Sequence, residues 1–374
     1  MKNAVILGCI LLLTGIILVP PALPHESSSV RIIYVDDDNT EGPWDGSSEH
    51  PYRFIQHGID AADDGDTVYV FVGNYYEHLE IRMSLQLLGE HKRMTTIHGK
   101  DKGDLIHVYS NGTTIKGFYL MHGGPENNDA AIEVGMYANN NTISDNLVSH
   151  CTNGIYLPDS CNNIVANNTF IHLDKIAIEI GFDSNNNIIC HNTIGPDVLF
   201  GIRLIDSHYN TLSQNVIKNI GESGISLDES HHNILSSNII KICRQGIYLA
   251  GSRDTTIADN VITSTLDGIS FSSYNREKTS GAMITGNTMK RNLNGLSIGD
   301  NDGNVAQSNT FQCNIRDVFI CNPDNEFEHN YWGHPRLLPK MIAVYDTYHN
   351  EFTFIGIIFD LHPRLFPVLH WETT

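Results

Sequence analysis

The feature that most constrains this chain is an internal repeat of 22 to 24 residues. A Gly-Ile-x-Leu motif and its variants recur with first residues 22 to 24 apart, except for one interval of 27. A second motif, Asn-x-Ile-x-x-Asn-x-Ile, alternates with it and lengthens to 27 at the same place. Two markers with one shared period indicate a solenoid of stacked coils. The second asparagine of that motif stands at Asn146, Asn168, Asn192, Asn215, Asn238, Asn260, Asn287, Asn309 and Asn330.

Each repeat contains short runs in which apolar residues alternate with polar ones, such as Ile225 and Leu227, then Leu235, then Ile240. This alternation is typical of strands whose alternate side chains enter a narrow core. Leucine-rich repeats share the period, but the Leu-dominated spacing they need is absent. We therefore expect parallel strands about 4.8 Å apart, with equivalent residues stacked in columns. Two inward columns are predicted: Ile143, Val165, Ile189, Leu212, Leu235, Ile257, Ile284, Ala306, Phe327; and Val148, Phe170, Ile194, Ile217, Ile240, Ile262, Met289, Phe311, Trp332.

The repeated asparagines and glycines are expected to have structural roles. Stacked amides can donate to one coil and accept from the next, as in the Asn ladders of stacked sheets. Asparagine also tolerates the left-handed conformation that a sharp corner requires, so we expect the Asn column at such corners. Glycine at the other corner leaves out a Cβ where the chain bends.

Net charge excludes some classes of partner. The chain has 23 Lys and Arg against 43 Asp and Glu, a formal charge of −20. Such a chain repels phosphate backbones, so we expect no nucleic-acid partner and no binding to anionic membrane surfaces. Cations and neutral sugars remain open as ligands.

The N-terminus predicts export. Lys2 precedes an apolar run over residues 4–19, which three prolines follow within five residues. At 16 residues the run is short for a membrane span of about 20. We interpret residues 1–24 as a secretory signal peptide, with an uncleaved membrane anchor as the alternative. The expected location is extracellular, at the cell surface or periplasmic.

Two caps are expected to cover the ends of the stack. Residues 51–62 carry apolar side chains at helical spacing, which predicts a helical N-terminal lid. The period stops after Asn330, and residues 352–359 could cover the other end. We therefore assign residues 32–67 to an N-terminal cap, 68–335 to the solenoid and 336–374 to a C-terminal cap or tail.

The N-terminal cap contains the motifs Tyr34-Val-Asp-Asp-Asp38, Pro51-Tyr-Arg-Phe-Ile-Gln56, Gly58-Ile-Asp-Ala-Ala62, Gly65-Asp-Thr-Val68, Val70-Phe-Val-Gly-Asn-Tyr75 and Glu77, and the last repeat ends in Asn330-Tyr-Trp-Gly333. On these motifs, residues 32–335 resemble the right-handed parallel β-helix proteins of the pectin-lyase-like superfamily, most of all exported NosD-like and CASH-type repeat proteins. The cap is the most specific part of the resemblance. The resemblance implies an all-β, single-stranded right-handed parallel β-helix of roughly eleven coils with a short helical cap. This fold serves lyases, hydrolases, epimerases, adhesins and accessory proteins, so it leaves the activity open.

The catalytic signatures of that superfamily do not carry over. Polygalacturonase-type hydrolases show Asn-Thr-Asp and a later Asp-Asp on adjacent coils. Here only Asn128-Asp129-Ala130 echoes the first motif, and the next coil offers no acidic pair. The Arg constellation of pectate lyases is also missing.

The outward position of Gly-Ile-x-Leu forms a row that suits a sugar chain lying along the sheet. Its candidate glycan-binding residues are Glu133, Tyr156, Glu179, Arg203 and Tyr248. Glu133 and Glu179 would lie two coils apart, about 9.6 Å, near the upper separation of carboxylates in an inverting glycosidase. This spacing keeps a catalytic alternative open.

Two further columns could bind metals. The corner after Gly-Ile-x-Leu begins Asp159, Asp183, Asp206 and Glu229, and stacked carboxylates could hold Ca²⁺, although Asp-Ser turns in water would look the same. One position further on, His208 and His231 fall on neighbouring coils and could share a transition metal. The resemblance to NosD-like proteins implies copper for that pair.

Three functions therefore remain open from the sequence. The leading one is an exported surface protein that binds or scaffolds a polysaccharide or cell-surface glycan. The alternatives are a polysaccharide lyase or hydrolase with a divergent site, and a copper-handling accessory protein. No cofactor is certain, with Ca²⁺ as the candidate.

Overall fold

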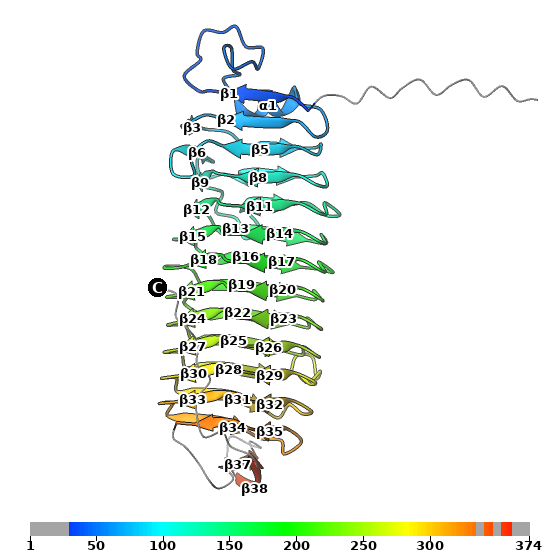
Figure 1. Cartoon of the computed structure of the whole chain (residues 1–374), viewed down its shortest axis with the longest axis vertical. Coiled ribbons are helices and arrows are strands. Elements are labelled where there is room, and N and C mark those ends of the chain that lie inside the picture. The colour runs from blue at the N-terminus through cyan, green and yellow to red at the C-terminus, as the bar shows by residue number, and fades with distance from the viewer. Residues whose placement is uncertain (1–29, 334–339, 347–352, 361–374) are drawn as a thin grey trace, which may run out of the picture. The chain divides into compact units, whose positions relative to one another are not determined.

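The computed structural model describes residues 30–333, 340–346 and 353–360. These residues form a parallel β-solenoid with three faces, in which each coil contributes one strand to each of three sheets (Figure 1). Sheets A and C have 13 strands each and sheet B has 12, so the stack contains about twelve coils. The expected all-β solenoid is confirmed, with slightly more coils than the roughly eleven predicted.

Sheet A is parallel throughout, and from β11 onward each of its strands comes just before a residue of the Asn column. Its strands are β1 (Ile32–Val35), β2 (Thr67–Val70), β5 (Gln86–Gly89), β8 (Thr114–Lys116), β11 (Thr142–Ser144), β14 (Ile164–Ala166), β17 (Ile188–Cys190), β20 (Thr211–Ser213), β23 (Ile234–Ser236), β26 (Thr256–Ala258), β29 (Met283–Thr285), β32 (Val305–Gln307) and β35 (Glu326–Glu328).

Sheet B is also parallel and comes next along each coil. Its strands are β3 (Gly73–Tyr75), β6 (Thr95–His98), β9 (Tyr119–Met121), β12 (Leu147–Ser149), β15 (Thr169–Ile171), β18 (Thr193–Ile194), β21 (Val216–Lys218), β24 (Ile239–Lys241), β27 (Val261–Thr263), β30 (Thr288–Lys290), β33 (Thr310–Gln312) and β36 (Tyr331–Trp332).

Sheet C contains the Gly-Ile-x-Leu motifs and ends in an antiparallel hairpin, β37–β38. Its strands are β4 (Leu79–Ile81), β7 (Ile106–Val108), β10 (Ala130–Val134), β13 (Asn153–Pro158), β16 (Ile176–Gly181), β19 (Phe200–Ile205), β22 (Ser223–Asp228), β25 (Gln245–Ala250), β28 (Asp267–Ser272), β31 (Asn294–Gly299), β34 (Arg316–Ile320), β37 (Lys340–Asp346) and β38 (Thr353–Asp360).

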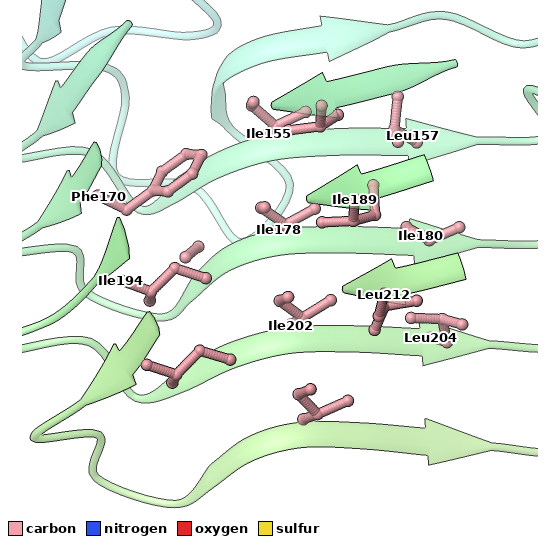
Figure 2. Packing of buried hydrophobic residues seen from close by; sticks show 14 of the residues in the cluster. Ile155, Leu157, Phe170, Ile178, Ile180, Ile189, Ile194, Ile202, Leu204 and Leu212 are labelled. Atoms are coloured by element: carbon pink, nitrogen blue, oxygen red, sulfur yellow. The ribbon is translucent and has the colours of Figure 1, made fainter. Parts of the chain in front are cut away.

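The core is a narrow apolar interior that runs along the stack, and both predicted inward columns are buried in it. Figure 2 shows side chains of equivalent type repeating from coil to coil, among them Ile155, Ile178 and Ile202 on sheet C. Glycine opens most of the sheet C motifs, where the coils approach closely, and alanine takes its place at Ala131 and Ala177. A Cβ on Gly154 would lie 2.3 Å from the Ala177 carbonyl oxygen.

The Asn column forms the ladder that the sequence predicts. Asn215, for example, donates from Nδ2 to the Ile189 carbonyl, and its Oδ1 accepts the backbone N–H of Asn192. The expectation of a left-handed conformation for these asparagines is wrong. The residue before each ladder Asn takes the positive φ instead, as Gln214 does at 56°, so the amide remains free to bond between coils.

Both ends of the described stack are covered. The single described helix, α1 (Ile55–Asp60), contacts β1, β2 and β4, and the Glu77 carboxylate accepts the N–H groups of Ile55 and Gln56. This bears out the expected helical cap. At the other end buried Asp360 accepts the backbone N–H of Asn330 and the indole N–H of Trp332, so it continues the ladder where the asparagines stop.

Candidate functional site

The outward-facing side chains in the middle of sheet C form one continuous line, here called the outer row. The backbone register places its members directly beside one another on successive strands, so the alignment predicted from the repeat is confirmed. Strands β13, β16, β19, β22 and β25, which carry much of it, lie in sequence in Figure 1. The outer row comprises Glu80, His107, Glu133, Tyr156, Glu179, Arg203, Ser226, Tyr248, Ser270, Ser297 and Phe319.

Tyr156 lies between two carboxylates on the neighbouring strands, those of Glu133 and Glu179. Burial, reinforced by those two carboxylates, raises the pKa of the phenol to about 12, so the hydroxyl stays a hydrogen-bond donor at neutral pH. Burial also raises the pKa of Glu179, although Arg203 and Lys175 oppose that shift. The arrangement presents one aromatic ring and two carboxyl groups to any molecule lying along the row.

Arg203 is the last charged member along the middle of the outer row. Its guanidinium lies 3.1 Å from Asp228 and over the ring of Phe200, which fixes its orientation and balances its charge. The next members are Ser226, Tyr248 and Ser270, and both serines are covered by their neighbours. The charged half of the row therefore ends at β19.

Upstream of Tyr156, the structure brings together three residues that sequence reasoning did not select as a group: Asp104, His107 and Glu133. Their ligating atoms all lie within 4.8 Å of one another, and no other group of three His, Cys, Asp or Glu side chains does so among the described residues. His107 stands between the two acids, with Nδ1 3.6 Å from Asp104 and Nε2 3.9 Å from Glu133. This cluster is the part of the site best suited to a metal.

The three groups shift one another's protonation. Burial, helped by the nearby Asp104 carboxylate, raises the pKa of Glu133 to about 7. Contact with Asp104 raises the pKa of His107 above its usual value, against the effect of burial. Burial alone would raise the pKa of Asp104, yet His107 and the Ala130 N–H lower it overall. The Asp104 carboxyl is therefore the most readily ionised of the three, whereas His107 and Glu133 bind their protons more tightly than usual.

The cluster borders a hollow of about 510 Å³ that is lined in part by His78, Glu80 and Tyr109. His107 stacks on Tyr109, with ring centroids 4.0 Å apart, and Arg82 covers the same tyrosine while pairing with Glu80. Both ring nitrogens of His78 contact carbonyl oxygens, those of Asp104 and Gly99. We therefore assign His78 a structural role rather than that of a ligand in the hollow.

The predicted acidic row has an irregular corner. The sheet C register ends with Pro158, Gly181 and Ile205 side by side, so the next residues in line are Asp159, Phe182 and Asp206. One extra residue lies at this corner, and the N–H of Asp183 donates to the Asp206 carbonyl at 2.8 Å. The same register places Asp206 beside Glu229, and the stacking of all four carboxylates stays a prediction. Whether they bind Ca²⁺ stays a prediction.

The predicted histidine pair does come together. The rings of His208 and His231 stack at 4.9 Å between centroids and are nearly parallel. Each Nδ1 accepts a backbone N–H from the next coil, from His231 and Arg253 respectively. Such bonding assigns the proton of each neutral ring to Nε2. The pair is therefore built into the inter-coil bonding, and its predicted role with copper stays a prediction.

A longer histidine column escaped the sequence analysis. His98, His122, His150 and His172 stack in order, with centroids 4.5, 5.3 and 5.6 Å apart. Nδ1 of His122 lies 3.0 Å from Asp101, and Nδ1 of His172 lies 2.9 Å from Asp197. A carboxylate on one ring nitrogen is the usual partner of a metal-ligating histidine.

The missed residues lie where the period is least regular. The four histidines are 24, 28 and 22 residues apart, and His107 precedes Glu133 by 26. The long intervals span residues 123–128, which extend one coil between β9 and β10. If the repeat is continued upstream of residue 131 with a loop of variable length, the sequence aligns both the histidine column and His107 with Glu133.

The fold is similar to those of several polysaccharide-active proteins. A mannuronic acid specific polysaccharide family 6 lyase from human gut microbiota superposes with a TM-score of 0.59 at 14% identity, covering 81% of each chain. The A-module of mannuronan C-5 epimerase AlgE6 from Azotobacter vinelandii gives 0.56 at 14% identity, covering 81% of this chain and all of the module. The GH136 lacto-N-biosidase from Eubacterium ramulus gives 0.57 at 10% identity, covering 79% and 68%. At these identities the likeness establishes the fold.

The sequence itself matches one family over most of its length. No curated protein matches the chain. The sequence profile described as periplasmic copper-binding protein (NosD) matches residues 59–223 and 218–335, which span the solenoid. Among the described residues, no helix is both long and apolar enough to cross a bilayer. The chain belongs to the NosD family.

Proposed function

We propose that this chain is an exported β-helix protein that binds a glycan along the charged half of the outer row. A β-solenoid offers a straight series of equivalent positions, and a polysaccharide is a straight series of equivalent rings. The structures similar in fold include a lyase, an epimerase and a biosidase named for their polysaccharide or glycan substrates. The family is described as periplasmic, which is consistent with export.

The observation that carries the proposal is Tyr156, half-buried between Glu133 and Glu179 with Arg203 beyond. A fixed aromatic ring offers an apolar surface to the C–H face of a sugar. Carboxyl groups on both sides can bond to hydroxyls along that sugar. Such a combination suits a sugar ring, which has an apolar C–H face and hydroxyl groups around its edge.

The charge of the chain narrows the class of glycan. With 43 acids against 23 bases, the protein repels polyanions at long range. We therefore assign a neutral glycan to the outer row in metal-free conditions.

A glycan array with the purified chain tests this function. We expect binding of neutral glycans by the native chain and strong loss in the double variant Tyr156→Ala/Tyr248→Ala. Tyr209→Ala is the matched control, because Tyr209 is exposed and stacks on His232 outside the outer row. No binding by the native chain, or equal binding by the double variant, would refute the proposal.

The same glycans separate binding from catalysis. The lyase or hydrolase alternative predicts that incubation releases unsaturated or reducing ends and that Glu179→Gln abolishes the release. Pure binding predicts an intact oligosaccharide by mass spectrometry in both the native chain and the variant.

Copper handling is the second candidate, and the histidine column favours it. Imidazole suits copper, and the Nε2 edges of His122, His150 and His172 remain for a ligand because their Nδ1 atoms face Asp101, Ser149 and Asp197. The rings are stacked, so the column offers neighbouring single-imidazole positions rather than a closed chelate. Bound copper would supply a redox-active, exchangeable ion.

Equilibrium dialysis with copper tests this candidate. We expect the triple variant His122→Gln/His150→Gln/His172→Gln to lose copper, and His208→Gln/His231→Gln to retain it. Less than one copper per native chain would dismiss copper handling, and loss in the second variant alone would assign it to the pair predicted from the sequence.

A further inference from the structure

Asp104, His107 and Glu133 lie close enough together to share an ion, because ligating atoms taken one from each residue are all within 4.8 Å of one another. His107 approaches Asp104 at 3.6 Å and Glu133 at 3.9 Å, both beyond hydrogen-bond length. The two acids flank the ring, Asp104 beside Nδ1 and Glu133 beside Nε2, and each of the three side chains is about one-fifth exposed. Zinc at about 2.0–2.2 Å from each donor holds its donors up to about 4.4 Å apart, so small side-chain rotations bring one atom of each residue onto a common ion.

The surrounding residues orient the three donors before any ion arrives. Asp104 accepts the Ala130 N–H through Oδ1 at 2.7 Å, which leaves Oδ2 toward His107. His107 is held by stacking on Tyr109. The absence of a side chain at Gly135 leaves space for the ring, since a Cβ there would lie 3.0 Å from Nε2. Supports of this kind are what a metal site needs around its ligands.

We propose that Asp104, His107 and Glu133 form a binding site for a first-row divalent cation, with Zn²⁺ as the best fit. One imidazole and two carboxylates match zinc, whereas Ca²⁺ prefers oxygen ligands alone and Cu⁺ prefers sulfur. Three protein ligands leave a coordination position open. Because the cluster borders the hollow beside His78, Glu80 and Tyr109, that position can receive water or an oxygen of a bound molecule.

This site shares Glu133 with the proposed glycan face but uses neither Tyr156 nor the histidine column, and its occupation is measured without any glycan. If the glycan proposal also holds, the ion would lie at one end of the charged half of the outer row, next to Glu133. Its positive charge would then offset the acidic surface there and allow a sugar carboxylate to approach.

The test is zinc binding by the metal-stripped full chain, followed by dialysis and elemental analysis. It is made in the background His122→Gln/His150→Gln/His172→Gln, so that zinc on the histidine column is not counted. We expect one zinc per chain, with affinity reduced at least tenfold by His107→Gln and by Glu133→Gln. Co²⁺ should give a visible absorption band that both substitutions remove.

His208→Gln is the matched control. Its imidazole is as exposed as that of His107 and lies 3.7 Å from Asp206, but no third ligating group from the described residues joins the pair. Zinc affinity in this variant should equal that of the background chain. Unchanged zinc binding in His107→Gln, or equal loss in His208→Gln, would overturn the proposal.

Anomalous diffraction at the zinc edge provides a test that needs no variant, so misfolding cannot obscure the result. A peak among Asp104, His107 and Glu133 is the expected result. A zinc-soaked crystal with peaks elsewhere and none at this cluster would overturn the assignment.

Discussion

The two halves of the outer row share one scaffold but differ in chemistry. From β7 to β19 the row presents His107, Glu133, Tyr156, Glu179 and Arg203. From β22 to β31 it presents three serines and one tyrosine.

The inward neighbours hardly change between those halves. Ile155 and Ile178 in the first half correspond to Ile225 and Ile247 in the second, and all four are fully buried. A solenoid therefore separates stability from function. Inward and ladder positions maintain the stack, while outward positions can take any chemistry without disturbing it.

The largest effect we expect comes from the shared scaffold and should be equal in the two halves. Asn168→Ala leaves the Ile143 carbonyl and the Asn146 N–H without their partners. Asn260→Ala does the same to Leu235 and Asn238. Each substitution should lower the free energy of unfolding by about 2–4 kcal/mol, since two buried groups lose their hydrogen bonds.

Urea denaturation measures both losses. Asn74→Ala is the control, because Asn74 is exposed and its side chain has no place in the ladder; it should change stability by less than about 0.5 kcal/mol. If Asn168→Ala and Asn260→Ala differed by more than about 2 kcal/mol, the scaffold would not be uniform.

A smaller effect should separate the halves. Tyr156→Ala should weaken binding of an array-selected oligosaccharide about tenfold, or about 1.4 kcal/mol. Tyr248→Ala should weaken it less than about threefold, because the neighbours of Tyr248 in the outer row are serines rather than carboxylates. Isothermal titration calorimetry checks both. Equal losses would mean that the glycan uses the whole row.

The smallest effect is a pH dependence confined to the charged half. Burial raises the pKa of Glu179 above that of the unfolded chain, so the native state binds the proton more tightly. The resulting stabilisation is complete below about pH 4.5 and is lost as the pH rises through the native pKa. Glu179→Gln should therefore show a smaller fall in Tm on going from pH 4.5 to 8 than the native chain.

Thermal melts in a metal-free buffer series provide that comparison. Glu326→Gln, on an exposed strand position of sheet A, should retain the native slope. If Tm of Glu179→Gln depended on pH as steeply as Tm of the native chain, burial of this carboxyl would have no effect on stability.

The sequence was sufficient to predict the fold because the same physical demand recurs in every coil. A narrow core accepts only apolar side chains at alternate positions, and a ladder amide works only if another stands one coil away. Asn215 and Ile217 thus belong to columns in which the same kind of residue recurs from coil to coil. The helix α1 was also predictable, from the apolar spacing around Ile55 and Ile59.

The site was only partly predictable, because function depends on local departures from the repeat. The outer row from Glu133 onward follows the period and was identified. Asp104 and His107 lie before an extended coil, which shifted their register and hid their proximity to Glu133. The corner at Phe182 and Asp183 departs in the same way, since one extra residue there shifts the register that the period predicts. The pKa of Glu133 is raised by burial and by Asp104, which lies before the extended coil, so the sequence around Glu133 does not reveal the shift.

The most direct test of the central claim, that the charged half of the outer row is the functional face, is a crystal structure with an array-selected oligosaccharide. The account predicts sugar density over β10 to β19, with one ring against Tyr156. Density over sheet A or sheet B, or only over the serine-rich half from β22 onward, would contradict it.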